Sequence, residues 1–219
     1  MIKLHTALGR FEMRRNKDKK QYPVAVLDGK EYLLDICEMI MWSGLAWAIQ
    51  TTDELREIYE TKLSEAEISA GVPFSECLDY LENRGLVISG TGYTGMDALY
   101  ALTNSLYVIP VNERLLTKIL AFLHLTFIKN MPFKQTKKIF ITEKLTGDER
   151  FVLDIISESK WLAGELIHYC SNTESAADCG ENSEYTDFLY PEYKPALQAV
   201  INLYLKKLIL FEKLEVKNI

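Results

Sequence analysis

Cysteine is scarce in this 219-residue sequence, and the four cysteines that are present do not form a recognisable motif. None of Cys37, Cys77, Cys170 and Cys179 belongs to a Cys-x-x-Cys pair, the spacing that is typical of zinc and redox sites. With His168, the last two offer three soft ligands where a structural zinc site needs four. We therefore expect reduced thiols in a cytoplasmic protein that uses no metal and no cofactor.

Long apolar runs are missing as well. No run approaches the roughly 18 residues that span a bilayer, and the most apolar segment, residues 115–128, contains Lys118 and His124. The first 15 residues, MIKLHTALGRFEMRR, lack the continuous apolar core of a signal peptide. With only 6 prolines and 11 glycines and 48% hydrophobic residues, the chain is neither collagen-like nor disordered. We expect a globular protein with no membrane partner.

Charge alternates along the chain beneath a net charge of −6. Residues 1–30 contain eight Lys and Arg against three Asp and Glu, and residues 114–144 contain seven against one. Residues 31–113 contain three against fourteen, and residues 145–219 contain seven against thirteen. This pattern predicts two acidic domains, with a basic hairpin before the first and a basic connector between them. Each basic block is either a surface for nucleic acid or an acidic partner, or an ordinary solvated face.

The first 35 residues favour strands and a hairpin. From residue 7 onward the pattern predicts strands, with a polar tip at 16–20. Two β-prone runs, Tyr22–Leu27 and Lys30–Leu34, then flank Asp28-Gly29, a dipeptide typical of two-residue hairpin turns because both turn positions need a positive φ.

Three helices are expected next. Capping boxes at 35–38 and 51–54 predict the starts of the first two, because the cap and the acid three residues later bond each other's free amides. The third is expected to follow Pro73 and to end at Gly85. Residues 86–89 and 98–108 are predicted to pair as a β-hairpin through a glycine-rich tip, which gives the element order of a winged helix.

The second half repeats this logic. Thr146 opens another capping box, Trp161–Tyr169 predicts a short helix, Lys194-Pro195 opens a third helix, and residues 208–211 predict a terminal strand. Before this unit, residues 112–129 predict a helix that is apolar almost all round, either buried between the units or shared across a homodimer. Within the second unit, residues 171–192 contain six acids and no base, which predicts an acidic loop.

The expected fold is therefore α+β and mostly helical, with tandem winged-helix (helix–turn–helix-like) units and an N-terminal β-hairpin sheet. We place the first unit at 1–111, the connecting helix and basic linker at 112–144, and the second unit at 145–219.

The stretch VAVLDGKEYLLDICEMIMWSGLAWAIQTTDELREIYETKL, followed by FSECLDYLENRGLVI, resembles the PqqD-like family, also called the RiPP recognition element. The resemblance covers roughly residues 7–95. It implies three strands before a trihelical winged-helix body. It also implies that a leader peptide binds as an added strand along the third strand, against the third helix.

Catalytic patterns are weak in this sequence. Gly90-Thr-Gly-Tyr-Thr-Gly95 matches the Gly-x-Gly-x-x-Gly pattern but is expected to turn the wing hairpin rather than bind a nucleotide, because no βαβ unit surrounds it. His5 and His124 have no partner at a suggestive spacing, and no Ser or Cys lies in a nucleophile motif. We expect no enzymatic activity.

Two functions remain open. In the first, a peptide or protein partner binds the N-terminal β-edge beside an acidic helix, and replacing Tyr32 with proline is expected to remove an edge amide. The residues expected at this site are Tyr32, Leu34, Phe74, Glu76, Leu78, Asp79 and Leu81.

In the second, the protein is a DNA-binding transcriptional regulator. Glu76, Asp79 and Glu82 on the first unit's third helix oppose docking on phosphates, so the second unit's third helix would enter the major groove. The residues expected to contact DNA are Lys194, Gln198, Asn202, Lys206 and Lys207.

Overall fold

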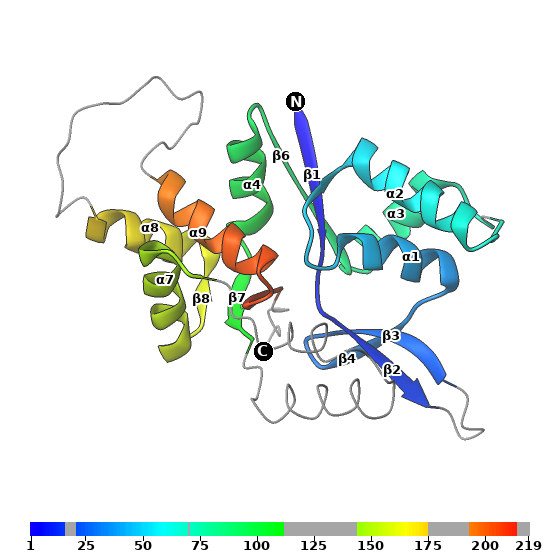
Figure 1. Cartoon of the computed structure of the whole chain (residues 1–219), viewed down its shortest axis with the longest axis horizontal. Coiled ribbons are helices and arrows are strands. Elements are labelled where there is room, and N and C mark those ends of the chain that lie inside the picture. Colours follow the sequence, from blue (N-terminus) through cyan, green and yellow to red (C-terminus); the bar gives the residue numbers. More distant parts are fainter. Residues whose placement is uncertain (16–20, 70, 112–143, 175–192, 214–219) are drawn as a thin grey trace, which may run out of the picture.

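A computed structural model describes residues 1–15, 21–69, 71–111, 144–174 and 193–213. Of these residues about 51% are helical and 26% lie in strands, which confirms the α+β class. Figure 1 shows an N-terminal lobe built around α1, α2 and α3 and a C-terminal lobe built around α7, α8 and α9, with β6, α4 and β7 between them. No helix in the described ranges is both long and apolar enough to cross a membrane.

The N-terminal hairpin sheet forms as expected. Strands β2 (Arg10–Arg15), β3 (Gln21–Leu27) and β4 (Lys30–Leu33) pair antiparallel in the order β2-β3-β4. Asp28 and Gly29 have φ values of 49° and 72°, so the predicted two-residue turn is confirmed. The polar tip at 16–20 lies outside the described residues.

The three helices that follow are α1 (Ile36–Leu45), α2 (Thr52–Glu65) and α3 (Phe74–Asn83). The capping boxes at the starts of α1 and α2 are both present, and Gly85, with a φ of 70°, ends α3. These predictions are confirmed because they depend on residues within one helical turn of each other.

A second sheet joins the ends of this unit. Its order is β5-β1-β6, from β5 (Gln50–Thr51), β1 (Ile2–Ala7) and β6 (Val87–Gly92). Strand β1 lies in the centre and pairs antiparallel with both neighbours, so that Leu4 faces Thr51 on one side and Gly90 on the other.

The predicted hairpin between residues 86 and 108 is wrong. Residues Gly95–Thr103 form helix α4, which begins with a capping box of Thr94 and Asp97, and β7 (Tyr107–Pro110) pairs elsewhere. The glycine motif is therefore no wing tip: a Cβ on Gly90 would lie 2.3 Å from the Leu102 backbone nitrogen, so the glycines let α4 pack directly on β6. The hairpin prediction failed because the capping box was overlooked and the run of apolar residues suited either structure.

The second unit contains α7 (Gly147–Glu158), β8 (Trp161–Leu162), α8 (Ala163–Glu174), α9 (Lys194–Leu205) and β9 (Ile209–Glu212). The capping box at Thr146 and the proline in the first turn of α9 are confirmed. The expected helix from Trp161 starts two residues later, at Ala163. The acidic loop expected at 171–192 is wrong at its start, because residues 171–174 continue helix α8. The rest of that loop, the connecting helix at 112–129 with its proposed dimer contact, and the basic loop lie outside the described residues.

Both units share one topological plan. Apart from the β2-β3-β4 sheet of the first unit, the described residues of each unit form a strand, a helix, a two-residue strand, two helices and a final strand in that order along the chain. The sheet of the second unit is ordered β8-β7-β9, with the first strand of the unit in the centre, as β1 is in β5-β1-β6. Strand β7, expected in the first unit, supplies that central strand of the second.

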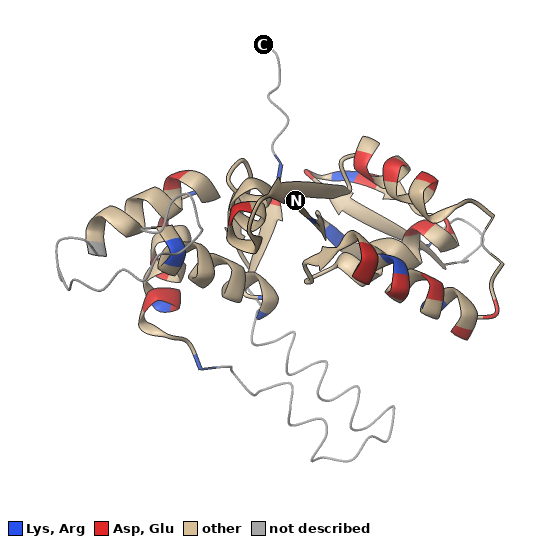
Figure 2. Ribbon diagram, turned by 90° about the horizontal axis from the view of Figure 1, so that it is seen from above, with Lys and Arg blue, Asp and Glu red and all other residues tan. Residues whose placement is uncertain are grey.

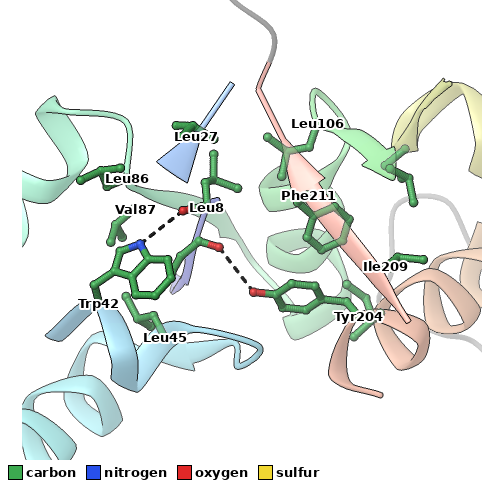
Figure 3. Packing of buried hydrophobic residues seen from close by; sticks show 14 of the residues in the cluster. Leu8, Leu27, Trp42, Leu45, Leu86, Val87, Leu106, Tyr204, Ile209 and Phe211 are labelled. Atoms are coloured by element: carbon green, nitrogen blue, oxygen red, sulfur yellow. Dashed lines mark hydrogen bonds between the residues drawn. The ribbon is translucent and has the colours of Figure 1, made fainter. Parts of the chain in front are cut away.

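Buried hydrogen bonds join the two units. The Tyr204 hydroxyl of α9 lies 2.8 Å from Thr6 Oγ1 and accepts the Trp47 amide at 3.2 Å, while Thr6 donates to the Ala48 carbonyl at 2.8 Å. Figure 3 shows the Tyr204 side chain directed toward the first unit, where the Trp42 indole donates to the Leu8 carbonyl at 3.3 Å. One apolar core accordingly extends through both units.

Candidate functional site

A groove lies between the end of β4 and helix α3. It encloses about 590 Å³, and within the described ranges no strand pairs with the outer edge of β4 beside it. We call it the β4–α3 groove; its lining residues are Tyr22, Pro23, Leu33, Leu34, Asp35, Glu38, Val72, Glu76, Cys77, Tyr80 and Arg84.

The groove combines exposed apolar side chains with negative charge. Leu33 and Tyr80 are 62% and 56% exposed, which is high for large apolar residues beside a concave surface. Glu76 contributes a solvent-exposed carboxylate from α3. Figure 2 shows further acidic residues along the helices of the N-terminal lobe. The surface therefore suits a ligand with apolar and cationic groups.

Arg84, at the C-terminal end of α3, connects the two walls of the groove. Its guanidinium donates to Glu38 Oε1 and to the Leu33 carbonyl, both at 2.8 Å, and lies over the rings of Tyr32 and Tyr80 at 5.6 and 5.3 Å. Glu38 is nearly buried and also caps α1. Arg84 thus neutralises a buried carboxylate and holds α3 beside β4.

The strand register decides which amides of β4 point to its outer edge. Leu27 and Lys30 close the two-residue turn as a hydrogen-bonded pair, so Tyr32, opposite Ala25, is bonded to β3 as well. Glu31 and Leu33 alternate with Lys30 and Tyr32 along β4, so their N–H groups point away from β3, to the outer edge of the strand. The prediction that Tyr32→Pro removes an edge amide is therefore wrong, because the Tyr32 amide faces β3.

The expected peptide-site residues separate into lining and core residues. Leu34 and Glu76 line the groove, and Tyr32 lies under Arg84. Leu78 and Leu81 are 5% and 0% exposed and form part of the core.

Two expected residues lie beside the groove rather than in it. Phe74 packs on Tyr59 with ring centroids 5.8 Å apart and lies beneath Arg56, so it faces α2. Asp79 is exposed on α3 without lining the groove.

Sequence reasoning missed several groove residues. Tyr80 and Arg84 follow Glu76 at positions i+4 and i+8 and therefore share its helix face, a signal that could have identified both. Pro23 and Leu33 could not be found in this way, because their place depends on how the hairpin sheet packs against α3.

Three of the five residues expected to contact DNA are bonded to other side chains, and α9 leaves only one face exposed. Lys206 donates to both oxygens of Glu149 at 2.7 and 2.8 Å. The Gln198 amide donates to Asn202 Oδ1 at 2.9 Å, and seven of the twelve residues of α9 are buried. Lys194 and Lys207 are exposed.

His5 has partners from distant parts of the chain that sequence spacing did not indicate. Its Nε2 lies 2.9 Å from Thr52 Oγ1, and its Nδ1 lies 3.2 Å from Glu82 Oε1 but out of line for a hydrogen bond. Burial, and then Lys3, lower the His5 pKa, while Glu82 opposes them. The imidazole is fully buried and does not line the β4–α3 groove, so this array stabilises the contact of β1 with α2 and α3.

Other reactive groups offer no site in the described part of the chain. Burial raises the pKa of Cys77 to about 12, so this groove residue is an inert thiol. No three His, Cys, Asp or Glu side chains within the described ranges could hold a metal ion. Cys170 is buried, and Cys179 lies outside the described residues.

Comparison of the chain with protein-family models, curated proteins and solved structures gave no significant match.

Proposed function

We propose that this chain is a non-catalytic recognition protein that binds an extended peptide, or an extended segment of a protein, in the β4–α3 groove. The peptide adds to the outer edge of β4, where the Glu31 and Leu33 amides supply main-chain hydrogen bonds. Its apolar side chains pack on Leu33 and Tyr80, and its cationic side chains face Glu76.

The observation that supports this most is that a 590 Å³ groove lies beside a strand edge that no other described strand pairs with. An exposed edge alone is a hazard that proteins usually cover. Here exposed apolar side chains from both β4 and α3 lie next to that edge. A bound strand would cover all of them at once.

We also propose that each unit is a rearranged winged helix. Three helices pack with a three-stranded sheet, but the central strand comes from the start of the unit rather than from a wing after the third helix. The β2-β3-β4 sheet followed by α1, α2 and α3 supports a relationship to the PqqD-like family in the first unit.

DNA binding is the weaker proposal. A helix in the major groove needs free cations for the flanking phosphates, whereas the Lys206 ammonium is bonded to a carboxylate that is 1% exposed. The corresponding helix of the first unit presents Glu76 and Asp79 to solvent.

The test is selection of a random 12-residue phage-displayed library on the whole chain, followed by calorimetry with the selected peptides. Peptides rich in Lys, Arg and apolar residues should be recovered. Their affinity should fall at least tenfold in Glu76→Lys/Asp79→Lys. The control Glu57→Lys/Glu60→Lys makes the same charge change on exposed positions of α2 and should remain within threefold of wild type. Equal losses in both variants would show that net charge, not the groove, attracts the peptide.

A further inference from the structure

The second unit repeats the ion pair that bounds the β4–α3 groove. Arg84, the C-cap residue of α3, bonds Glu38 of α1 and the Leu33 carbonyl. Lys206, the C-cap residue of α9, bonds Glu149 of α7 at 2.7 Å and the Lys144 carbonyl at 3.2 Å. Glu38 and Glu149 both occupy helix position N3 of a capping box, and both carbonyls lie five residues before these acids.

The backbone after each pair is also the same. Gly85 and Lys207 follow with φ values of 70° and 62°. The next amides, of Leu86 and Leu208, donate to the carbonyls of Leu81 and Leu203 at 3.0 and 2.9 Å. The two sites therefore correspond residue by residue, not only in their order of elements.

This correspondence identifies the positions on α9 that are equivalent to the groove residues near α3. Val72, Glu76 and Tyr80 precede Arg84 by twelve, eight and four positions, and the residues that precede Lys206 by the same intervals are Lys194, Gln198 and Asn202. We call these three residues the α9 face. Lys194 and Gln198 are exposed and Asn202 is half-buried. The Gln198 amide donates to Asn202 and Asn202 bonds Glu149, so Lys194 and Gln198 are the groups of this face that solvent reaches.

The chemistry of the α9 face is opposite to that of the groove. Residues 194–207 contain three lysines and no Asp or Glu, and Glu149 neutralises only Lys206. Lys194 lies in the first turn of α9 and has no counterpart in α3, because Val72 precedes that helix. Gln198 replaces the carboxylate of Glu76. Amides and an ammonium group suit carboxylate side chains.

We propose that the α9 face is a second binding surface and that it takes an acidic extended peptide segment. This rests on the proposed function, because the role of the first groove is transferred by the correspondence. The chain would then bind two segments of opposite charge, one on each unit, and joining both segments in one partner would raise its affinity through effective concentration.

The test uses the same random 12-residue library on the full chain, in the presence of excess basic peptide selected for the groove. A second pool, rich in Asp and Glu, should be recovered. Calorimetry should show at least tenfold weaker binding of these peptides to Lys194→Glu/Gln198→Glu. The basic peptide should stay within threefold of its wild-type affinity. The control Ser157→Glu/Lys160→Glu makes the same charge change at exposed positions of the same unit and should leave both affinities unchanged.

The two proposals fail separately in this design. The proposal for the α9 face is overturned if no acidic pool is recovered, or if the acidic peptides bind Lys194→Glu/Gln198→Glu as well as wild type. In either case the basic peptide still tests the groove. Displacement of the acidic peptides by a 20-base-pair DNA duplex assigns the face to nucleic acid and overturns it as well. Loss of the basic pool alone overturns the proposed function of the groove.

Discussion

At the scale of single residues, two buried carboxylates determine how the third helix of each unit lies against the first. Glu149 is 1% exposed and is bonded by the Lys206 ammonium and the Thr146 amide. Glu38 has the same arrangement with Arg84 and Asp35. A buried charge that loses its partner is costly, so each of these pairs can be tested by removing the cation.

Lys206→Met should destabilise the protein by about 3 kcal/mol, because it leaves the Glu149 carboxylate buried without its counter-ion. Urea unfolding followed by circular dichroism measures the change. The exposed Lys160→Met is the control and should change stability by less than about 0.5 kcal/mol. A Lys206→Met variant as stable as wild type would show that water replaces the ammonium.

Acid should weaken the fold in part through Glu149. Burial opposes ionisation of this carboxylate, but the hydrogen bonds from Lys206 and Thr146 outweigh it, so the pKa of Glu149 is lowered. The ionised group therefore stabilises the fold above its unfolded pKa of about 4.5, and this contribution disappears as the pH falls through the lowered folded value.

Melting temperatures at pH 7, 5 and 3 test this. Glu149→Gln should be less stable than wild type at pH 7 and should lose less stability between pH 5 and 3. Exposed Glu57→Gln should follow wild type at every pH. Parallel curves for wild type and Glu149→Gln would exclude Glu149 as a source of the acid sensitivity.

Gly90 tests the direct packing of α4 on β6. A Cβ here would lie 2.3 to 2.5 Å from backbone atoms of Leu102 and Ala98, whereas a Cβ on Gly95 would meet nothing within 4 Å. Gly90→Ala should therefore cost about 3 kcal/mol by overpacking, and Gly95→Ala should be neutral or slightly stabilising. Thermal unfolding of both variants measures the difference, and equal stabilities would contradict the close approach.

At the scale of elements, strand β4 pairs with β3 along one edge and with no described strand along the other. Its inner amides bond β3, and its outer amides, at Glu31 and Leu33, point away from β3; of these two residues, Leu33 lines the groove. The alternation of the antiparallel ladder makes neighbouring positions in one strand unequal, so a proline scan can separate folding from binding.

Leu33→Pro should leave the fold nearly intact and weaken the groove peptide at least tenfold, because it removes an outward amide. Tyr32→Pro should instead destabilise the hairpin, because it removes an inward one. Calorimetry with the selected basic peptide and thermal unfolding give the two readouts. Wild-type affinity in a folded Leu33→Pro variant would exclude strand addition at β4.

At the scale of the whole molecule, the two units are held as one body by the hydrogen bonds of Tyr204. Its ring also packs on Trp47 and Phe211, with centroids 5.6 and 4.7 Å apart. Trp47 has a φ of 61°, an unusual conformation for a bulky residue. The hydrogen bond from its backbone N–H to the Tyr204 hydroxyl helps to hold it in this conformation. The units are therefore expected to unfold together.

Tyr204→Phe should lower stability by about 2 kcal/mol, since the Trp47 amide and the Thr6 hydroxyl each lose a buried partner. Exposed Tyr93→Phe, at 84% exposure, should have no measurable effect. Denaturant curves from fluorescence and circular dichroism should still coincide in wild type. Two separate transitions there would show that the units are independent domains.

The sequence by itself determined the local elements of this protein. The Asp28-Gly29 turn, the capping boxes at Asp35, Thr51 and Thr146, and the end of α3 at Gly85 were all predictable, because each depends on residues a few positions apart. The helix face with Glu76, Tyr80 and Arg84 was available from periodicity in the same way.

Only the tertiary structure decided which distant parts meet. The central place of β1, the helix at Gly95–Thr103, the pairing of β7 with β9 and the partners of Arg84 and Lys206 depend on contacts between segments far apart in the chain. Short patterns do not encode such contacts, because many pairings bury similar apolar area. The groove itself exists only once those contacts have formed.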